Sequence, residues 1–432
     1  MSTGGQGGEG GSGGTAGSGQ WGTGGFSSDP SAWRAVHVEG EWEKEQLMEG
    51  DVSKLPFKPL KWEANCGSHC ESAVLAPEAN VMALNAVLGA VRDEEGVSVY
   101  AASRQGVPDP PLGAVLWRGI RLSDGRTVGA LRLQPLVSYA YESPGLFFIG
   151  PSPSYVVVLS NHRFLRGSFH APSRTWEWKT PFTDSIWGGF WCTRFDVDTT
   201  PPALIDACPA GVMVRDRPGT IDGELVPDSR YSYIASGFGG MAVWSQLPND
   251  SSSSGVWGWT PERGVWKVAE IPGNVCSLSL TDDRLVGVRG GPPERGGLCD
   301  DSLESPQIFV MPREGGGRID SPPFSKPFKI DIRAYGDYAA AFASKYVEKG
   351  SEHHVLLIRL TDWKIRRFRP RPERYVSSLD AIAVDGTHFY YVDEIMKPGE
   401  YPLVDRVYRY PLSAFDSIGE PFDPWETEPP AP

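Results

Sequence analysis

The chain has 432 residues with a formal net charge of −13, and it contains 51 glycines, 38 prolines and 15 tryptophans. So much glycine and proline excludes a helix bundle or a coiled coil, and a hydrophobic fraction of 40% excludes a wholly disordered chain. The acidic balance argues against nucleic acid as the main partner, because phosphates need a basic surface. No run of about 18 apolar residues is present, so the sequence predicts no transmembrane segment.

Residues 1–29 are predicted to form a disordered, glycine-rich tether. Thirteen of the first 25 residues are glycine, so this stretch has little to bury and much backbone entropy to lose on ordering. Met1 is not followed by the basic and apolar regions of a signal peptide. One interpretation is a mature chain that has lost a signal segment, with a lipid anchor upstream of the given sequence. The other is a cytoplasmic protein with a glycine-rich tail.

The C-terminal residues 419–432 are rich in proline and acidic side chains. They are expected to form a tail that adds no central strand, because proline cannot donate to a β ladder. The folded body is then expected to span residues 30–418.

Six cysteines form an even set that falls into sequence-local pairs. The simplest of the connectivities that six cysteines allow joins Cys66 to Cys70, Cys192 to Cys208 and Cys276 to Cys299. Free buried thiols are one alternative. Zinc at Cys66, His69 and Cys70 is another, but a structural zinc site needs a second pair of ligands and none follows. We expect disulfides and no metal, which indicates an oxidising compartment: the periplasm, the cell surface or the outside.

Short apolar runs rich in valine, tyrosine, phenylalanine and tryptophan recur along the chain, each closed by glycine, aspartate or proline. Helical periodicity is nearly absent, and only residues 77–88 fit a short helix, or a strand about as well. The recurring units start about 45–53 residues apart, near Ala86, Tyr139, Asp184, Tyr231, Cys276, Lys329 and Ser378. A four-stranded unit of this size cannot bury both its faces alone, whereas radial stacking buries them. The predicted fold class is all-β: a single β-propeller of seven four-stranded blades.

The last unit carries the clearest pattern. Residues 381–391 read AIAVDGTHFYY, and residues 407–412 read VYRYPL. Asp385 and Gly386 are expected to form the hairpin turn, where glycine tolerates a positive φ. Four apolar side chains at alternate positions are expected to face a neighbouring blade: Ile382, Val384, Phe389 and Tyr391.

This pattern resembles the blades of large bacterial extracytoplasmic propellers, which are similar in plan to YWTD and NHL blades. Where that family has tryptophan after tyrosine, this chain has Tyr391. The glycine-rich start resembles the spacer that follows the lipid-bearing cysteine of bacterial surface lipoproteins of myxobacterial type. These resemblances imply a surface-lipoprotein-like, extracytoplasmic seven-bladed β-propeller. Closing such a ring needs one blade with strands from both chain ends, and residues 60–76 are a suitable donor.

The sequence contains no nucleophile elbow, phosphate-binding loop, zinc-protease motif or EF-hand loop. His353 and His354 are adjacent, so on a strand they should point to opposite faces and cannot share a metal. His388 is expected to be a structural hydrogen-bonding residue. Acidic residues gather near turns, where solvated charge is the default, for example Asp282, Asp283, Asp393 and Glu394.

Aromatic side chains are the one mild excess in the composition. Most are expected to pack between blades, but an exposed tryptophan or tyrosine can anchor a protein interface or stack on a sugar ring. The candidate ligand-binding residues are Trp187, Trp191, Tyr231 and Tyr233, and Trp187 is favoured because two glycines follow it. Residues 364–371 carry five cations; they form either a polar strand face with a loop or a contact for an acidic partner.

These features predict an extracytoplasmic, envelope-tethered β-propeller that binds an envelope protein or a glycan, with no catalysis and no cofactor. The alternative is a secreted carbohydrate hydrolase or lyase, in which acidic residues converge at the propeller channel. A structural component of a surface assembly is a third hypothesis. Propellers serve all three roles, so the fold alone does not decide between them.

Overall fold

The apolar runs form strands, and the glycines and aspartates between them form turns. The computed structural model describes residues 30–35, 38–39, 45–75, 82–93, 96–106, 115–135, 145–149, 155–160, 163–170, 175–179, 194–199, 202–208, 211–215, 224–227, 229, 232–246, 253–290, 305–325, 327–347, 350–369, 374–375, 381–395 and 403–425. In this part of the chain the helices are short 3-10 turns, η1 (Pro30–Ala32) and η5 (Leu412–Ser417). The described residues include no helix long and apolar enough to span a bilayer.

Five consecutive sheets share one up-and-down plan, in which each strand pairs antiparallel with the next strand of the chain. The first contains β9 (Gly145–Ile149), β10 (Tyr155–Ser160), β11 (Arg163–His170) and β12 (Thr175–Lys179), with β2 (Val38–Glu39) parallel to β12. The second contains β13 (Arg194–Thr199), β14 (Pro202–Cys208), β15 (Gly211–Arg215) and β16 (Glu224–Leu225).

The third sheet contains β17 (Ser232–Phe238), β18 (Met241–Gln246), β19 (Ser253–Thr260) and β20 (Gly264–Pro272). The fourth contains β21 (Asn274–Leu280), β22 (Arg284–Gly290), β23 (Gln307–Pro312) and β24 (Ile319–Asp320). The fifth contains β25 (Lys329–Tyr335), β26 (Tyr338–Val347), β27 (Gly350–Arg359) and β28 (Lys364–Phe368), and β33 (Glu420–Phe422) is added at its edge.

The largest sheet joins two groups of strands through one pairing, Val404 with Ala83. One group contains β5 (Met82–Asp93), β6 (Gly96–Gly106), β7 (Val115–Arg121) and β8 (Thr127–Pro135), followed by β3 (Glu45–Gly50) and β1 (Trp33–Ala35). The other contains β30 (Ile382–Val384), β31 (His388–Ile395), β32 (Leu403–Pro411) and β4 (Glu71–Val74), with β29 (Arg374–Tyr375) beside β31. Residues 82–88 therefore belong to a strand, not to the short helix that the sequence also allowed.

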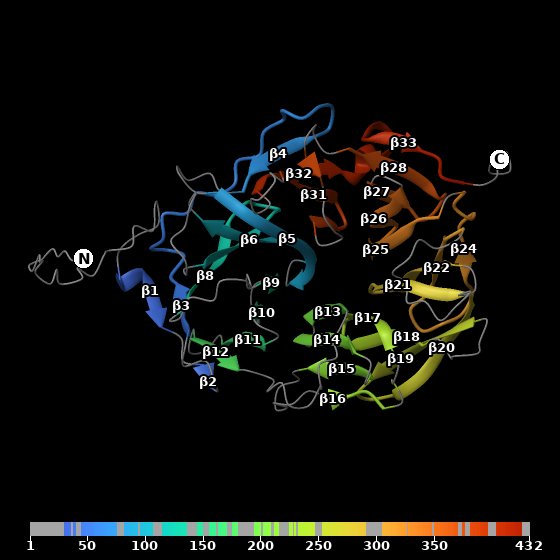
Figure 1. The fold of residues 1–432 in the computed structure, drawn as a ribbon, viewed down its shortest axis with the longest axis horizontal. Coiled ribbons are helices and arrows are strands. Elements are labelled where there is room, and N and C mark those ends of the chain that lie inside the picture. The colour runs from blue at the N-terminus through green and yellow to red at the C-terminus, as the bar shows by residue number, and fades with distance from the viewer. Residues whose placement is uncertain are drawn as a thin grey trace, which may run out of the picture.

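The sheets stand around a common centre, and the first strand of each consecutive group of four lies innermost: β5, β9, β13, β17, β21 and β25 (Figure 1). Neighbouring first strands contact one another from β13 through β17, β21 and β25 to β30, and onward to β5 and β9. Each sheet can bury both faces in this arrangement because another sheet lies on either side. The chain is therefore an all-β protein with the architecture of a β-propeller, as predicted.

The last blade is completed by an early strand, β4, which confirms residues 60–76 as the donor. β4 pairs antiparallel with β32, and Ala73 lies opposite Val407. Arg406 donates to the Ser72 hydroxyl at 2.8 Å. Next to it, Arg409 pairs with the Glu71 carboxylate at 2.6 Å. Strands from far apart in the sequence are thus joined through both main-chain and side-chain contacts.

One predicted disulfide lies just before this closing strand. Cys66 and Cys70 are bonded, with their Cα atoms 5.3 Å apart. Cys276 in β21 is also disulfide-bonded, while its predicted partner Cys299 lies outside the described residues. Cys192 lies outside them as well, and the Cys208 side chain is not among those described. The pairings Cys192–Cys208 and Cys276–Cys299 stay predictions.

The predicted alternation in the last unit is confirmed. Phe389 and Tyr391 contact Phe368 of the preceding sheet, with ring centroids 4.7 and 6.2 Å apart. Ile382 and Val384 belong to the same buried cluster. These contacts fix β31 against β28.

The turn prediction for this unit was wrong in one respect. Gly386 is not among the residues with positive φ. Asp385 holds the turn instead, because its Oδ1 accepts hydrogen bonds from the Thr387 and His388 main-chain N–H groups, both at 2.6 Å. A carboxylate that bonds the backbone two and three residues on makes a tight turn without needing glycine's conformational freedom.

The packed chain extends beyond residue 418, where the sequence suggested that the tail begins. β33 pairs with β28, and Trp425 forms a bridge with Phe324. Pro421 is tolerated in β33 because this strand lies at the sheet edge, in keeping with the expectation that the tail adds no central strand. The predicted tether, residues 1–29, lies outside the described residues.

Candidate interaction surface

Three of the four aromatic residues predicted to bind a ligand, Trp187, Trp191 and Tyr231, lie outside the described residues. Tyr233 lies in β17, one of the first strands at the ring's centre, but its side chain is not among those described. The ligand-binding role of these residues stays a prediction.

The turns of the described sheets gather at one end. In an up-and-down sheet, the turn between the first two strands and the turn between the last two lie at the same end. Main-chain hydrogen bonds join these turns: Arg313 donates to the Asp283 carbonyl at 3.0 Å, and Leu360 donates to the Asp337 carbonyl at 2.8 Å. We call this end of the ring the turn face.

On the turn face, arginine–carboxylate pairs connect successive sheets. Each arginine lies on one sheet and its partner on the next sheet or the segment after it: Arg263 with Glu314 at 2.8 Å, Arg284 with Asp337 at 3.0 Å, and Arg359 with Asp416 at 3.1 Å. The partners are 51, 53 and 57 residues apart, close to the repeat length. Exposed pairs of this kind contribute little stability individually, but they fix the relative positions of charges on neighbouring turns.

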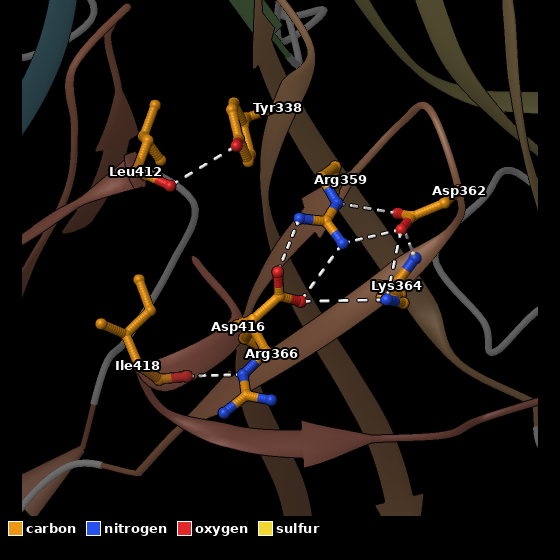
Figure 2. Close-up of polar contacts among 8 residues, drawn as sticks. All are labelled: Tyr338, Arg359, Asp362, Lys364, Arg366, Leu412, Asp416 and Ile418. Carbon is orange, nitrogen blue, oxygen red and sulfur yellow. Dashed lines mark hydrogen bonds and ion pairs between the residues drawn. The ribbon is translucent and has the colours of Figure 1, made fainter. Parts of the chain in front are cut away.

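Arg359 is the most highly connected of these arginines (Figure 2). Its guanidinium donates to both oxygens of Asp362, at 3.0 and 2.7 Å, and to both oxygens of Asp416, at 3.2 and 3.1 Å. Its carbon also lies 4.5 Å from the centre of the Phe415 ring. The hydrogen bonds that Arg359 donates to Asp362 and Asp416 raise its pKa. Lys364 completes the cluster, 3.6 Å from Asp362.

The turn around Arg359 has a counterpart between β7 and β8. Residues 121–126 read RLSDGR, and residues 359–364 read RLTDWK. In both, the aspartate accepts from the arginine three residues before it and from the main-chain N–H two residues after it. The intervening position is Gly125 at φ +71° in one turn and Trp363 at φ +57° in the other. This short repeat is the signal that sequence reasoning missed.

Protonation of Asp124 is expected to cost stability at low pH. Partial burial disfavours its charged form, but hydrogen bonds from Arg121 and Arg126 outweigh burial and lower its pKa from 3.8 to about 2. A lowered folded-state pKa stabilises the protein above pH 3.8, and that contribution is lost as the pH falls towards about 2. After allowance for solvent screening, we expect the ionised Asp124 to contribute about 1–2 kcal/mol to the free energy of unfolding. The free energies of unfolding of wild type and Asp124→Asn, measured with urea, should differ near neutral pH and converge towards pH 2. A difference that stays constant with pH would contradict this.

The described carboxyl groups with shifted pKa values share one direction. In each of them the pKa is lowered: Asp51, Asp124, Glu270, Asp283, Asp362, Asp416 and Glu420. Side-chain hydrogen bonds lower it, and for Asp124 and Asp283 they outweigh an opposing effect of burial. A general acid of a glycosidase needs the opposite shift, so that it keeps its proton near neutral pH. These carboxylates are anchored, ionised groups that suit a charged binding surface.

The basic run contacts acidic residues of its own chain. Arg367 and Arg369 both pair with Glu420 at 3.0 Å. Lys364 lies 3.9 Å from Asp416. The run is therefore a polar strand, as the first interpretation expected, and a contact with an acidic partner stays a prediction.

Three of the described histidines, His353, His354 and His388, have structural partners. His353 stacks on Phe342 while His354 packs against Phe328, which confirms that the two point to opposite faces. Burial lowers the pKa of both. The ring of His388 lies 2.9 Å from the Thr387 hydroxyl. No group of metal-binding side chains is found among the described residues, and the disulfide occupies both thiols of the alternative zinc site.

Serine hydroxyls join the innermost strands of neighbouring sheets. The Ser236 hydroxyl in β17 accepts from the Leu280 main-chain N–H at 3.0 Å. In β21, Ser277 accepts from Ile332 at 3.1 Å and Ser279 accepts from Ala334 at 2.8 Å. These inner strands lie at the sheet edges, where main-chain groups lack a neighbouring strand. The serines supply the acceptors that such edges need.

Ser277→Ala is expected to destabilise the ring by about 1–3 kcal/mol, because it leaves the buried Ile332 N–H without its acceptor. Ser277 and Ile332 are 2% and 1% exposed, so the group cannot turn to solvent. Thermal unfolding measures the effect, with Ser413→Ala in the exposed part of η5 as the control. Equal melting temperatures for the two variants would show that the serine bonds do not hold the sheets together.

No protein-family model and no curated protein matches the chain. Among solved structures, the β-propeller domain of the trilobed protease from Pyrococcus furiosus is 8% identical, with 74% of this chain and 93% of that chain covered and a TM-score of 0.44. The Pan2 WD40 domain from Neurospora crassa is 11% identical, with 80% and 96% covered and a TM-score of 0.39. The tricorn protease is 10% identical with a TM-score of 0.33; the match covers 83% of this chain but 37% of that one.

Proposed function

We propose that this protein is an envelope-tethered, extracytoplasmic β-propeller of seven blades that binds a protein or a glycan and catalyses no reaction. Seven blades are supported by the strand grouping: five sheets with one plan, and a sixth that divides into two groups at the Val404–Ala83 pairing. An oxidising location is supported by the disulfide between Cys66 and Cys70.

The observation that carries the binding role is the turn face. Its described carboxylates pair with arginines and lysines, and these ion pairs recur from sheet to sheet. A rigid array of fixed charges gives specificity and orientation to a docking partner. The lowered pKa values of Asp283, Asp362 and Asp416 also support a non-catalytic role, because a general acid needs a raised pKa.

The test compares the full chain with two double variants on a glycan array and against purified envelope proteins. Arg263→Ala/Arg284→Ala removes turn-face charges, and Trp187→Ala/Trp191→Ala removes two of the predicted ligand-binding aromatics. Ile319→Ala serves as the control, because that side chain is 64% exposed and lies on β24. We expect at least a tenfold loss of affinity in the double variants and none in the control. If chromatography shows that the wild-type protein cleaves an arrayed glycan, the hydrolase alternative is favoured.

The proposed location has its own test. Mass spectrometry of the purified native protein under non-reducing conditions is expected to show bonded cysteines. Six free thiols would overturn the extracytoplasmic assignment.

A further inference from the structure

Residues 419–425 lie on the outside of the β25–β28 sheet in the way that a bound peptide would. The preceding segment is anchored in the core through Leu412, Phe415 and Ile418, all 4% exposed or less. From residue 419 onward the segment is mostly at the surface, with Glu420 and Pro421 exposed. The chain therefore changes at this point from part of the core to a surface-bound strand.

The first contact is main-chain pairing. β33 lies antiparallel to β28, with Glu420 opposite Arg367 and Phe422 opposite Ile365. The sheet already has four strands without it, and the last blade is completed by β4. Strand addition at a sheet edge is a common way for a domain to bind an extended peptide.

The second contact is electrostatic. The Glu420 carboxylate is shared by Arg367 and Arg369, both at 3.0 Å. Arg366 donates to the carbonyls of Ile418 and Gly419. The outer edge of β28 thus favours a carboxylate at the position of Glu420 and holds the main chain just before that position.

The third contact is aromatic. The Phe422 ring stacks on His354 with centroids 5.5 Å apart, and the guanidinium of Arg367 lies 5.1 Å from its centre. The Trp425 ring meets Phe324 edge-to-face at 5.0 Å. Both rings are half-buried. An aromatic two residues after the carboxylate and a second three residues further on are therefore both recognised.

A single bend connects this segment to the core. Gly419 has φ +57°, and a Cβ at this position would lie 2.8 Å from the Arg367 carbonyl oxygen. Only glycine fits such a conformation and such an approach. The bend lays residues 420–422 along β28, and Trp425 beyond them lies against Phe324.

We propose that the outer edge of β28, together with His354 and Phe324, is a peptide-binding site that the chain's own C-terminal segment occupies. We call it the edge site. Its partner is an extended segment of another protein with a carboxylate followed by aromatics two and five residues later, as in Glu420, Phe422 and Trp425. The attached segment competes with that partner. The partner's apparent affinity is therefore its intrinsic affinity multiplied by the fraction of sites that the segment leaves unoccupied. The edge-site residues named in these contacts are not among the turn-face ion pairs or the four aromatic residues proposed above to bind a ligand.

The test uses the full chain and a fluorescent peptide with the sequence of residues 418–427. In a Phe422→Ala/Trp425→Ala variant the attached segment loses its aromatic anchors, so we expect the peptide to bind at least tenfold more tightly than to wild type by fluorescence anisotropy. A control peptide with alanine at the positions of Glu420 and Trp425 should bind the variant at least tenfold more weakly. A folded variant that binds neither peptide, or both equally, would overturn the proposal.

Hydrogen exchange on the wild-type chain keeps the proposal testable if the variant does not fold. Amides of residues 420–425 are expected to exchange at least a hundredfold faster than those of β26 and β27, because a competitor must detach without unfolding the sheet. Equal protection would show that the segment is an inseparable part of the sheet and would overturn the proposal. Trp187→Ala/Trp191→Ala should leave peptide binding unchanged, so failure of the edge site is distinguishable from failure of the proposed function.

Discussion

Phe389→Ala is expected to lower the free energy of unfolding by about 3–5 kcal/mol. The Phe389 ring is 0% exposed and lies 4.7 Å from Phe368 and 6.5 Å from Tyr410, measured between ring centroids. Removing it leaves a cavity between two successive sheets, and the neighbouring rings cannot collapse into it without moving a strand. Urea unfolding followed by tryptophan fluorescence measures the loss.

Phe389→Leu is the matched control, because it keeps an apolar side chain of similar volume and should cost about 1.5 kcal/mol or less. If Phe389→Ala costs no more than this control, the ring does not contribute to packing between the sheets. The packing of Phe368 in β28 would then have to be explained by Tyr391 in β31 and Tyr410 in β32.

The elements that were predictable depend on local patterns. Val384 and Phe389 lie on either side of a turn, and period-two alternation determines which side chains of a strand share a face. The turn itself was placed correctly, although Asp385 rather than a positive-φ glycine holds it. Residues 60–76 were recognisable as the closing segment because a ring with strands from both ends needs an early donor.

The charged contacts were not predictable in the same way. Arg359 and Asp416 are 57 residues apart, and only the finished ring brings the two turns together. The same holds for Glu420, which composition alone assigned to a solvated tail. Its contacts with Arg367 and Arg369 exist because the bend at Gly419 lays the tail along β28. Composition describes what a segment can bury, but it does not show which surface the segment meets.

Ala73→Asp is expected to destabilise the protein by about 3–5 kcal/mol by disrupting closure of the ring. Ala73 is 1% exposed and lies opposite Val407 in the pairing of β4 with β32. An aspartate there would bury a carboxylate with no cation opposite it. Burial raises the pKa of such a group, so the destabilisation should be largest near neutral pH and shrink as the pH falls and the carboxyl takes up a proton.

Glu71→Gln on the same strand is the control for this prediction. Glu71 is 41% exposed and its partner Arg409 lies at 2.6 Å, so the loss of a charge there should change stability little. Thermal unfolding across the pH range gives the size and direction of both effects. Hydrogen exchange of β32 shows where the Ala73→Asp variant opens, because β4 protects that strand in the closed ring. If the melting temperature falls while the amides of β32 stay protected, the substitution destabilises another part of the protein. β4 then does not hold the two ends of the ring together.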